Sequence, residues 1–92
     1  MIRSFRHKGL KQLFEDERSK AVPPALVNRL KIILDYLDAA ETIRDMNVAG
    51  LRLHELKGSR KETWSVTVSG NWRLTFRFHD GDSHDLDLED YH

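Results

Sequence analysis

The order of apolar and polar residues divides the chain into a helical first part and a second part built of strands. Between Pro24 and about Ala40, apolar side chains recur every three or four residues, which predicts an amphipathic helix. The stretch KGLKQLFE, residues 8–15, has the same spacing and predicts a shorter helix before it. IRSF, residues 2–5, favours a short first strand, while residues 41–50 have no sustained period and predict a connection.

After residue 50 the pattern changes to alternation, which is typical of strands with one buried face. Turn signals divide this part into four predicted strands: LRLHEL (51–56), TWSVTV (63–68), WRLTFRF (72–78) and HDLDLE (84–89). Short turns between them favour antiparallel neighbours. The fold class predicted is α+β, with two N-terminal helices packed on one face of a twisted, mainly antiparallel sheet.

The apolar positions also predict the register of both hairpins, because a slip of one residue would bury aspartates. In the first hairpin the expected pairs are Trp64–Phe76, Val66–Leu74 and Val68–Trp72. In the second they are Leu74–Leu88, Phe76–Leu86 and Phe78–His84. On the polar face this register places Arg73 opposite Glu89 and Arg77 opposite Asp85.

Composition narrows the class of protein. A chain of 92 residues with 39% apolar content fills one modest core, so a single domain over residues 1–92 is expected. It has no cysteine, which excludes a disulfide framework or thiolate zinc site and suits the cytoplasm. There is no apolar run of the roughly 18 residues that a membrane span needs, nor the pattern of a signal peptide.

The formal net charge of zero hides an uneven distribution. Fifteen basic and nine acidic residues lie in positions 1–77, whereas positions 78–92 hold six acidic residues and no lysine or arginine. This polarity suits strands that pair by opposite charge, and it equally leaves a basic surface for phosphate.

Two arginines on the polar face of the third predicted strand need an explanation. Cross-strand ion pairs, which contribute about 0.2–1 kcal/mol each, account for Arg77. Arg73 differs because it lies at the strand end nearest the C-terminal EDYH and beside the polar side of the strand around His54. An antiparallel sheet covered on one side leaves this face open to a polyanion.

Three segments have a distinctive order and spacing: LxxLKG at 53–58, WSVxV followed by NWRLTF between Trp64 and Phe76, and the terminal DYH. Together with the opening MIRSFRHKGLKQLFE, they make the chain resemble the HigB branch of the RelE-type toxins, also called plasmid-maintenance killer proteins. The resemblance runs nearly end to end. It implies a RelE-like fold and a toxin of a type II toxin-antitoxin system that acts as an endoribonuclease on mRNA in the ribosomal A site.

The same resemblance implies the partners of the protein. These are the ribosome with its mRNA and a cognate antitoxin, commonly a helix-turn-helix protein, through which alone operator DNA is contacted. No cofactor, metal or membrane partner is expected.

Metal-free RNA cleavage by the 2′-hydroxyl needs a base at that hydroxyl, an acid at the departing 5′-oxygen and cations at the phosphate. With the resemblance, Arg73 is expected to hold the phosphate and Lys57 to add charge. The acid and base candidates are His54, Tyr91 and His92. Tyr91 has a second possible role, which is to stack on an unpaired base.

Three further residues are expected around this site: Asp90 as an orienting group, and Arg60 and Lys61 as additional cations. The additional cations matter because some members of this branch carry another arginine on the strand before NWR. Here the outward residues of that strand are Ser65, Thr67 and Ser69.

Plainer interpretations stay open beside these. His54 is equally a surface histidine, Lys57 a turn lysine, and DYH a polar terminus that frays. A metal site in HDGDSHDLDLED is disfavoured, because its acids alternate along a strand without the spacing of a known metal motif. A non-catalytic RNA- or ribosome-binding module of the same fold is the main alternative, and only substitutions distinguish it from an enzyme.

Overall fold

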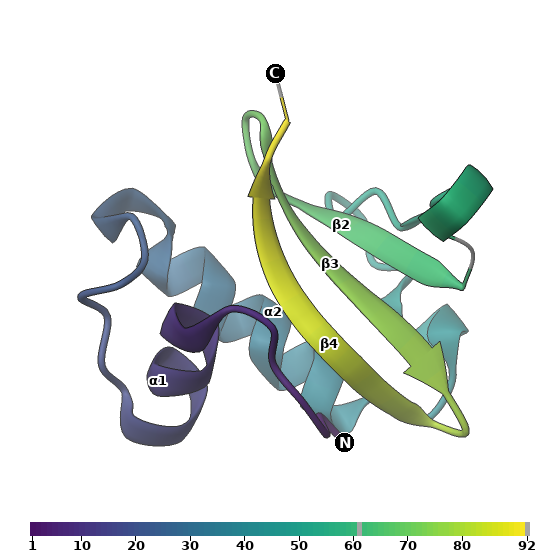
Figure 1. Cartoon of the computed structure of the whole chain (residues 1–92), viewed down its shortest axis with the longest axis horizontal. Coiled ribbons are helices and arrows are strands. Elements are labelled where there is room, and N and C mark those ends of the chain that lie inside the picture. Colours follow the sequence, from purple (N-terminus) through teal and green to yellow (C-terminus); the bar gives the residue numbers. More distant parts are fainter. Residues whose placement is uncertain (61, 92) are drawn as a thin grey trace.

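The computed structural model describes residues 1–60 and 62–91, which form two α-helices and one four-stranded antiparallel sheet (Figure 1). The helices are α1 (Lys8–Asp16) and α2 (Val27–Ala39). The sheet has the order β1 (His54–Glu55), β2 (Thr63–Ser69), β3 (Trp72–His79) and β4 (Asp82–Asp90). Three short 3₁₀ turns are η1 (Pro24–Leu26), η2 (Ile43–Met46) and η3 (Gly58–Arg60). The predicted α+β class is confirmed, as is the antiparallel sheet.

Both predicted helices are present, and local chemistry sets their ends. His7 caps α1, because its Nδ1 accepts a hydrogen bond from the backbone N–H of Leu10 at 3.2 Å. Proline supplies the first turn before α2, as the sequence predicts. Figure 1 shows α2 behind the sheet and α1 to the side of β4.

One apolar cluster joins the helices to the sheet. Leu30, Ile33, Leu34 and Leu37 form the buried stripe of α2. They pack against apolar side chains from one face of the sheet: Val66, Val68, Leu74, Phe76, Leu86 and Leu88. The alternation that predicted this face is therefore confirmed.

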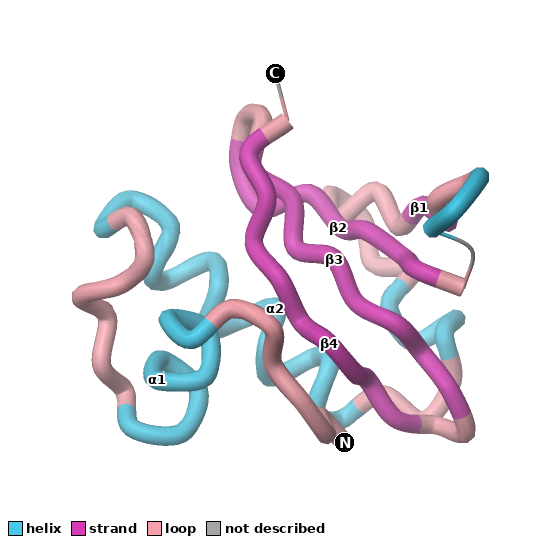
Figure 2. The backbone as a smooth tube through the Cα atoms, viewed as in Figure 1, coloured by secondary structure: helices cyan, strands magenta, loops and turns pink. Residues whose placement is uncertain are grey.

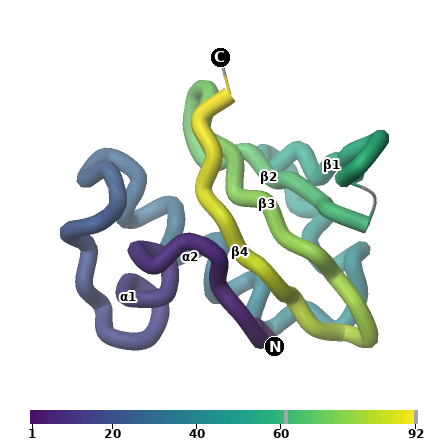
Figure 3. Tube along the Cα trace, in the orientation of Figure 1, coloured from purple at the N-terminus to yellow at the C-terminus, as the bar shows by residue number. Residues whose placement is uncertain are grey.

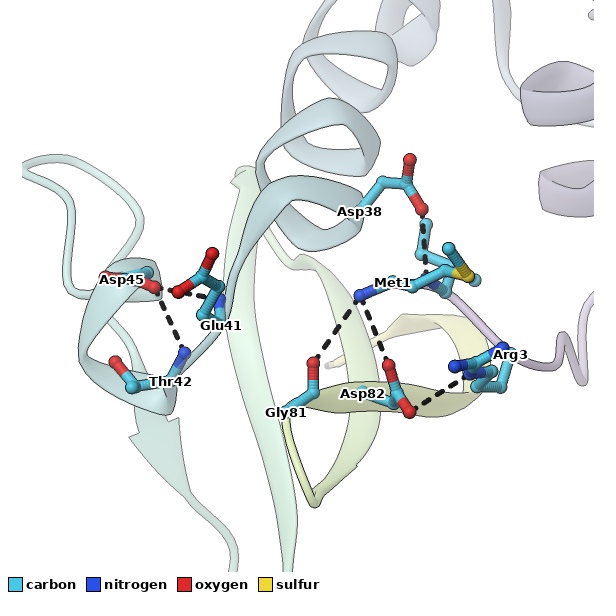
Figure 4. Close-up of polar contacts among 9 residues, drawn as sticks. Met1, Arg3, Asp38, Glu41, Thr42, Asp45, Gly81 and Asp82 are labelled. Carbon is cyan, nitrogen blue, oxygen red and sulfur yellow. Dashed lines mark hydrogen bonds and ion pairs between the residues drawn. The ribbon is translucent and has the colours of Figure 1, made fainter.

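The N-terminal segment does not form the regular strand that the sequence favours. Ile2 and Phe5 instead make isolated parallel bridges to Ser83 and Leu86 of β4. Figure 4 shows how polar contacts hold this segment: the Ile2 N–H donates to Asp38 at 3.0 Å, and the terminal amine lies 3.4 Å from Asp82. The free edge of β4 is thereby covered.

Figure 4 also shows an ion pair between Arg3 and Asp82, and the hydrogen bonds to Asp45 that cap a 3₁₀ turn. Arg3 hydrogen-bonds Asp82 at 3.0 Å, and this contact lowers the pKa of that carboxyl. Asp45 accepts from the backbone N–H groups of Glu41 and Thr42, which lowers its pKa in turn. The predicted connection over residues 41–50 therefore contains a capped 3₁₀ turn.

The predicted register is confirmed in the middle of the sheet and wrong near both turns. The pairs Trp64–Phe76, Val66–Leu74, Leu74–Leu88 and Arg73–Glu89 are present. A bulge between Thr67 and Ser69 pairs Trp72 with Ser69 rather than with Val68. Bulges insert an extra residue that no alternation pattern reveals.

A second bulge changes the β3–β4 hairpin. It lies between Thr75 and Arg77, where Asp85 on the partner strand adopts φ 55°. Phe78 consequently pairs with Ser83 instead of His84, Arg77 pairs with His84 instead of Asp85, and the predicted Phe76–Leu86 pair is absent.

β1 is shorter than the predicted strand over residues 51–56. Arg52 has φ 51°, a left-handed conformation that interrupts the extended backbone, so regular pairing covers only His54 and Glu55. Figure 2 shows β1 as a short segment at the edge of the sheet.

The C-terminal end of β4 lies beside the turn between β2 and β3 (Figure 3). The backbone N–H of Tyr91 donates to the carbonyl of Asn71 at 2.8 Å and fixes this arrangement. No helix within the described residues is long and apolar enough to cross a membrane.

Candidate active site

The polar face of the sheet has a concavity of about 480 Å³ at the end near the β2–β3 turn. Its described lining residues are Arg52, Leu53, His54, Leu56, Ser65, Thr67, Arg73 and Tyr91. We call it the Arg73 concavity. None of these described lining residues is acidic, so the positive charges in it face no carboxylate across the space.

The register explains why His54 and Arg73 share this concavity. His54 pairs with Ser65 on β2, and Arg73 pairs with the neighbouring Thr67 from the other side. Because adjacent strands are about 4.8 Å apart and the two pairs are two residues apart along β2, the Cα atoms of His54 and Arg73 lie roughly 12 Å apart. The short side chains of Ser65 and Thr67 form a floor between two long ones.

Arg73 is held in place by neutral groups. Its Nη1 donates to the carbonyls of Gly70 at 2.7 Å and Trp72 at 3.1 Å. Its Cζ lies 6.0 Å from the centroid of the Tyr91 ring, a cation–π arrangement. These contacts orient the guanidinium and engage one of its three nitrogens, so Nε and Nη2 are the atoms suited to bind two oxygens of a phosphate.

Tyr91 is anchored despite its place near the end of the chain. Its backbone is bonded to Asn71, and its hydroxyl accepts a hydrogen bond from Arg60 Nη1 at 3.3 Å. Its ring stacks below Arg73. A terminus usually frays unless such contacts tie it down, and here three contacts do so.

Arg60 is bound mainly to Glu89. Its Nη1 and Nη2 donate to the two carboxylate oxygens of Glu89 at 3.1 and 2.5 Å, and Thr75 donates to the same carboxylate at 2.7 Å. Burial alone raises the pKa of Glu89, but the bonds from Arg60 and Thr75 outweigh it and lower the pKa below its usual range. Since a carboxylate already balances its charge, Arg60 supports Tyr91 and is absent from the lining of the Arg73 concavity.

The remaining predicted site residues occupy other places. Lys57 is exposed between β1 and η3 and is not among the residues that line the concavity. Asp90 pairs with Trp72, which places it on the face of the sheet opposite to that of Arg73. Lys61 and His92 lie outside the described residues. The structure therefore brings together His54, Arg73 and Tyr91.

Two features of the site were not predicted from the sequence: Arg52 in the lining and the contact between Glu89 and Arg60. Arg52 lines the concavity, and its signal was its position two residues before His54 in the alternating LRLHEL. Glu89 lies opposite Arg73 as predicted, yet its carboxylate binds Arg60. No local pattern reveals that a loop residue takes this partner. Among the described residues, no group of three or more metal-ligating side chains is present.

Comparisons with known proteins identify the family of the chain. Residues 3–92 match the family described as "RelE-like toxin of type II toxin-antitoxin system HigB". The fold and this match define a RelE-like toxin. More particularly, the chain belongs to the HigB family of type II toxin-antitoxin systems.

Two relatives place the chain within that family. It is 48% identical to Endoribonuclease HigB of Proteus vulgaris over 92 residues, which covers 100% of both chains. It is 35% identical to Toxin HigB-1 of Vibrio cholerae serotype O1 (strain ATCC 39315 / El Tor Inaba N16961) over 83 residues, covering 88% of this chain and 87% of the relative.

Solved structures support the fold. The crystal structure of YafQ from E. coli strain BL21(DE3) superposes with a TM-score of 0.66 over 98% of this chain and 91% of that one, at 18% sequence identity. A point mutant of YafQ from E. coli gives a TM-score of 0.61 with the same coverage and identity. At this level of identity, the likeness concerns the fold alone.

Proposed function

We propose that this toxin is an endoribonuclease that cleaves mRNA in the A site of the translating ribosome, by attack of the 2′-hydroxyl and without a metal ion. The observation that carries the proposal is the Arg73 concavity, where an oriented guanidinium, an imidazole and a phenol line one space and no described lining residue is acidic. The 48% identity to a full-length Endoribonuclease HigB supports the same activity.

The chemistry assigns a separate task to each group. The 2′-oxygen attacks the adjacent phosphorus, its proton passes to a base, and the bond to the 5′-oxygen breaks. That oxygen takes a proton from an acid, and a 2′,3′-cyclic phosphate is left. Arg73 stabilises the extra negative charge on the phosphate oxygens with Nε and Nη2, an interaction that strengthens in the transition state.

His54 of β1 and Tyr91, which follows β4, both line this space, and we assign them as the acid and the base that the two reacting oxygens need. Lys57 and His92 remain proposed participants, Lys57 as an additional charge and His92 as an acid or base. Asp90, Arg60 and Lys61 are proposed to support the site, and Arg60 does so through its bonds to Glu89 and Tyr91.

As a type II toxin, the protein has a cognate antitoxin. We propose that this antitoxin is a helix-turn-helix protein and that it reaches α1 and the outer side of α2. Two large apolar side chains, Ile32 and Tyr36, are exposed one helical turn apart on α2 and suit such a contact. Operator DNA is then contacted through the antitoxin alone, and the toxin works in the cytoplasm with the ribosome.

The test is to add the toxin to a translating extract and map the 5′ ends of the message. We expect cuts only in mRNA engaged by ribosomes. The Arg73→Ala variant should leave the message intact. Binding to ribosomes without any cut by the wild-type toxin would instead identify a non-catalytic ribosome-binding module. Equal cutting of naked mRNA would refute the dependence on the ribosome.

A further inference from the structure

Arg52 is a second arginine of the Arg73 concavity, and no carboxylate of the described residues forms an ion pair with it. It lines the concavity and its side chain is exposed. Within residues 1–60 and 62–91 no ion pair links it to a carboxylate, whereas Arg60 on the same side of the sheet is bound to Glu89. Arg52 therefore keeps its charge available to an anion in this space.

The backbone places Arg52 beside Thr67 of β2, and Thr67 pairs with Arg73 on its other side. Regular pairing of β1 ends at His54–Ser65, and the register shifts by one residue before Arg52. A hydrogen bond of 2.6 Å from the Thr67 N–H to the Leu51 carbonyl ties the segment to β2 at this level. Two long guanidinium side chains thus flank one short threonine.

The backbone of Arg52 adopts a conformation that favours glycine. Its φ of 51° lies in the left-handed region, where a side chain with a Cβ costs about 1–2 kcal/mol relative to the right-handed one. Glycine or asparagine occupies this conformation more easily. Replacing Arg52 by glycine therefore removes the guanidinium without straining the backbone.

We propose that Arg52 and Arg73 bind the same RNA phosphodiester from opposite sides, above Thr67. This inference rests on the proposed ribonuclease function and adds a second cation at the phosphate. It also supplies the positive charge that β2 lacks on this face, where the residues that pair with Thr75 and Arg73 are the uncharged Ser65 and Thr67. Arg52 is a phosphate-binding residue in this assignment, and the acid and base are unchanged.

The experiment compares Arg52→Gly with Arg52→Lys, and uses Glu17→Gly as a matched control. Glu17 has φ 54° at the end of α1, so its replacement relieves the same kind of backbone strain far from the concavity. Three quantities are measured for each variant: the melting temperature, the cleavage rate in a translating extract, and the affinity of the free toxin for a fully 2′-O-methylated single-stranded RNA over a range of salt. The methylated RNA cannot be cut, because its attacking hydroxyl is blocked.

We expect Arg52→Gly to lower the cleavage rate at least about tenfold, as removal of a charged hydrogen-bond donor does. The slope of its log affinity against log salt concentration should become less negative by about one, because one phosphate contact is lost. Its melting temperature should be unchanged or higher. Arg52→Lys should regain the salt slope and part of the cleavage, and Glu17→Gly should cleave like the wild type.

An unchanged salt slope and cleavage rate in Arg52→Gly would overturn the assignment, even if Arg73→Ala is inactive and the ribonuclease proposal stands. A lower melting temperature with an unchanged slope would equally overturn it, because Arg52 would then be structural. If the wild-type toxin cuts no RNA at all, the proposed function fails, and the salt slope still decides whether Arg52 contacts phosphate.

Discussion

Arg73 and Arg77 lie on the same face of β3, four residues apart, yet their surroundings differ. Arg77 lies between two exposed carboxylates, with its nitrogens 3.5 Å from Glu62 and 3.9 Å from Asp85. Arg73 is held by two backbone carbonyls and by the ring of Tyr91. One guanidinium is thus matched by negative charge on the protein, whereas the other is oriented by neutral groups and keeps its charge for a ligand.

The space beside each arginine differs in the same way. A second concavity of about 450 Å³ includes Arg77 and is nearly as large as the Arg73 concavity. It also includes Asp85 and the Arg60 side chain that Glu89 binds. Residue type, sheet face and volume therefore do not separate the two regions. The placement of carboxylates does. In the second concavity Arg77 lies near Glu62 and Asp85, and Arg60 is bound to Glu89, so Arg6 is the remaining arginine of its lining. No described residue that lines the Arg73 concavity is acidic.

The largest expected effect comes from exchanging the two arginines for alanine one at a time. Arg73→Ala should reduce mRNA cleavage by about 10²–10³-fold and abolish growth arrest, because it removes the charge stabilisation of the transition state. Arg77→Ala is the matched control and should stay within about threefold of the wild type. Cleavage is measured by 5′-end mapping, and circular dichroism with antitoxin binding verifies the fold. Equal losses in both variants would erase the difference between the two regions.

A second test removes the aromatic side of the Arg73 concavity. A chain ending at Asp90 lacks Tyr91 and His92, and its cleavage should fall by about 10²-fold, which is typical for loss of an acid or base. Tyr91 is not part of the buried apolar cluster, so the melting temperature should stay close to that of the wild type. Tyr91→Phe separates the hydroxyl from the ring and should be less affected. Full activity of the shortened chain would transfer the acid and base roles to His54 and Lys57.

Glu89→Gln tests the hydrogen bonds that Glu89 accepts from Arg60 and Thr75. This change keeps the shape of the side chain but removes the charge that Arg60 binds and weakens the bond from the buried Thr75. We expect the free energy of unfolding to fall by about 1–3 kcal/mol. Cleavage should fall as well, because Arg60 then holds Tyr91 less firmly. Urea unfolding at pH 7 measures the first effect, and an unchanged midpoint would contradict it.

The pH dependence of stability gives a related prediction. The pKa of Glu89 is lower in the folded protein than the roughly 4.3 of the unfolded chain. At acidic pH the folded state therefore binds fewer protons than the unfolded chain does. Its contribution to stability is complete above about pH 4.3 and is lost as pH drops through the lower folded value. The difference in unfolding free energy between wild type and Glu89→Gln should therefore narrow below pH 4. Urea titrations from pH 7 to pH 3 measure it, and a constant difference would contradict the shift.

The smallest expected effect concerns the ion pairs of Arg77. About half of its side chain and of Asp85 is exposed, and Glu62 is more exposed still, so water and salt screen these pairs. Arg77→Gln should change the free energy of unfolding by less than about 1 kcal/mol, and 1 M salt should remove the difference. A larger or salt-independent loss would show that Arg77 carries more of the fold than its contacts suggest.

The amino-acid sequence by itself determined the larger elements of this protein. The helical spacing of Leu30, Ile33, Leu34 and Leu37 predicted α2, and the alternation along β2 and β3 predicted the buried face of the sheet. These patterns are reliable because burial acts on every residue of an element and repeats with its period. The pairing of Arg73 with Glu89 followed from the same alternation.

Only the tertiary structure decided which charges meet. The bulges near Ser69 and Asp85 shift the register after the last regular pair, and the left-handed Arg52 shortens β1. Arg60, at the end of η3, binds the carboxylate of Glu89, although Arg73 lies directly opposite Glu89 on the next strand. Such contacts depend on a few side chains brought together by distant parts of the chain, and they leave no period in the sequence. For that reason the sequence could indicate which basic residues are candidates to bind phosphate, but the fold selected which of the described ones have no carboxylate bound to them.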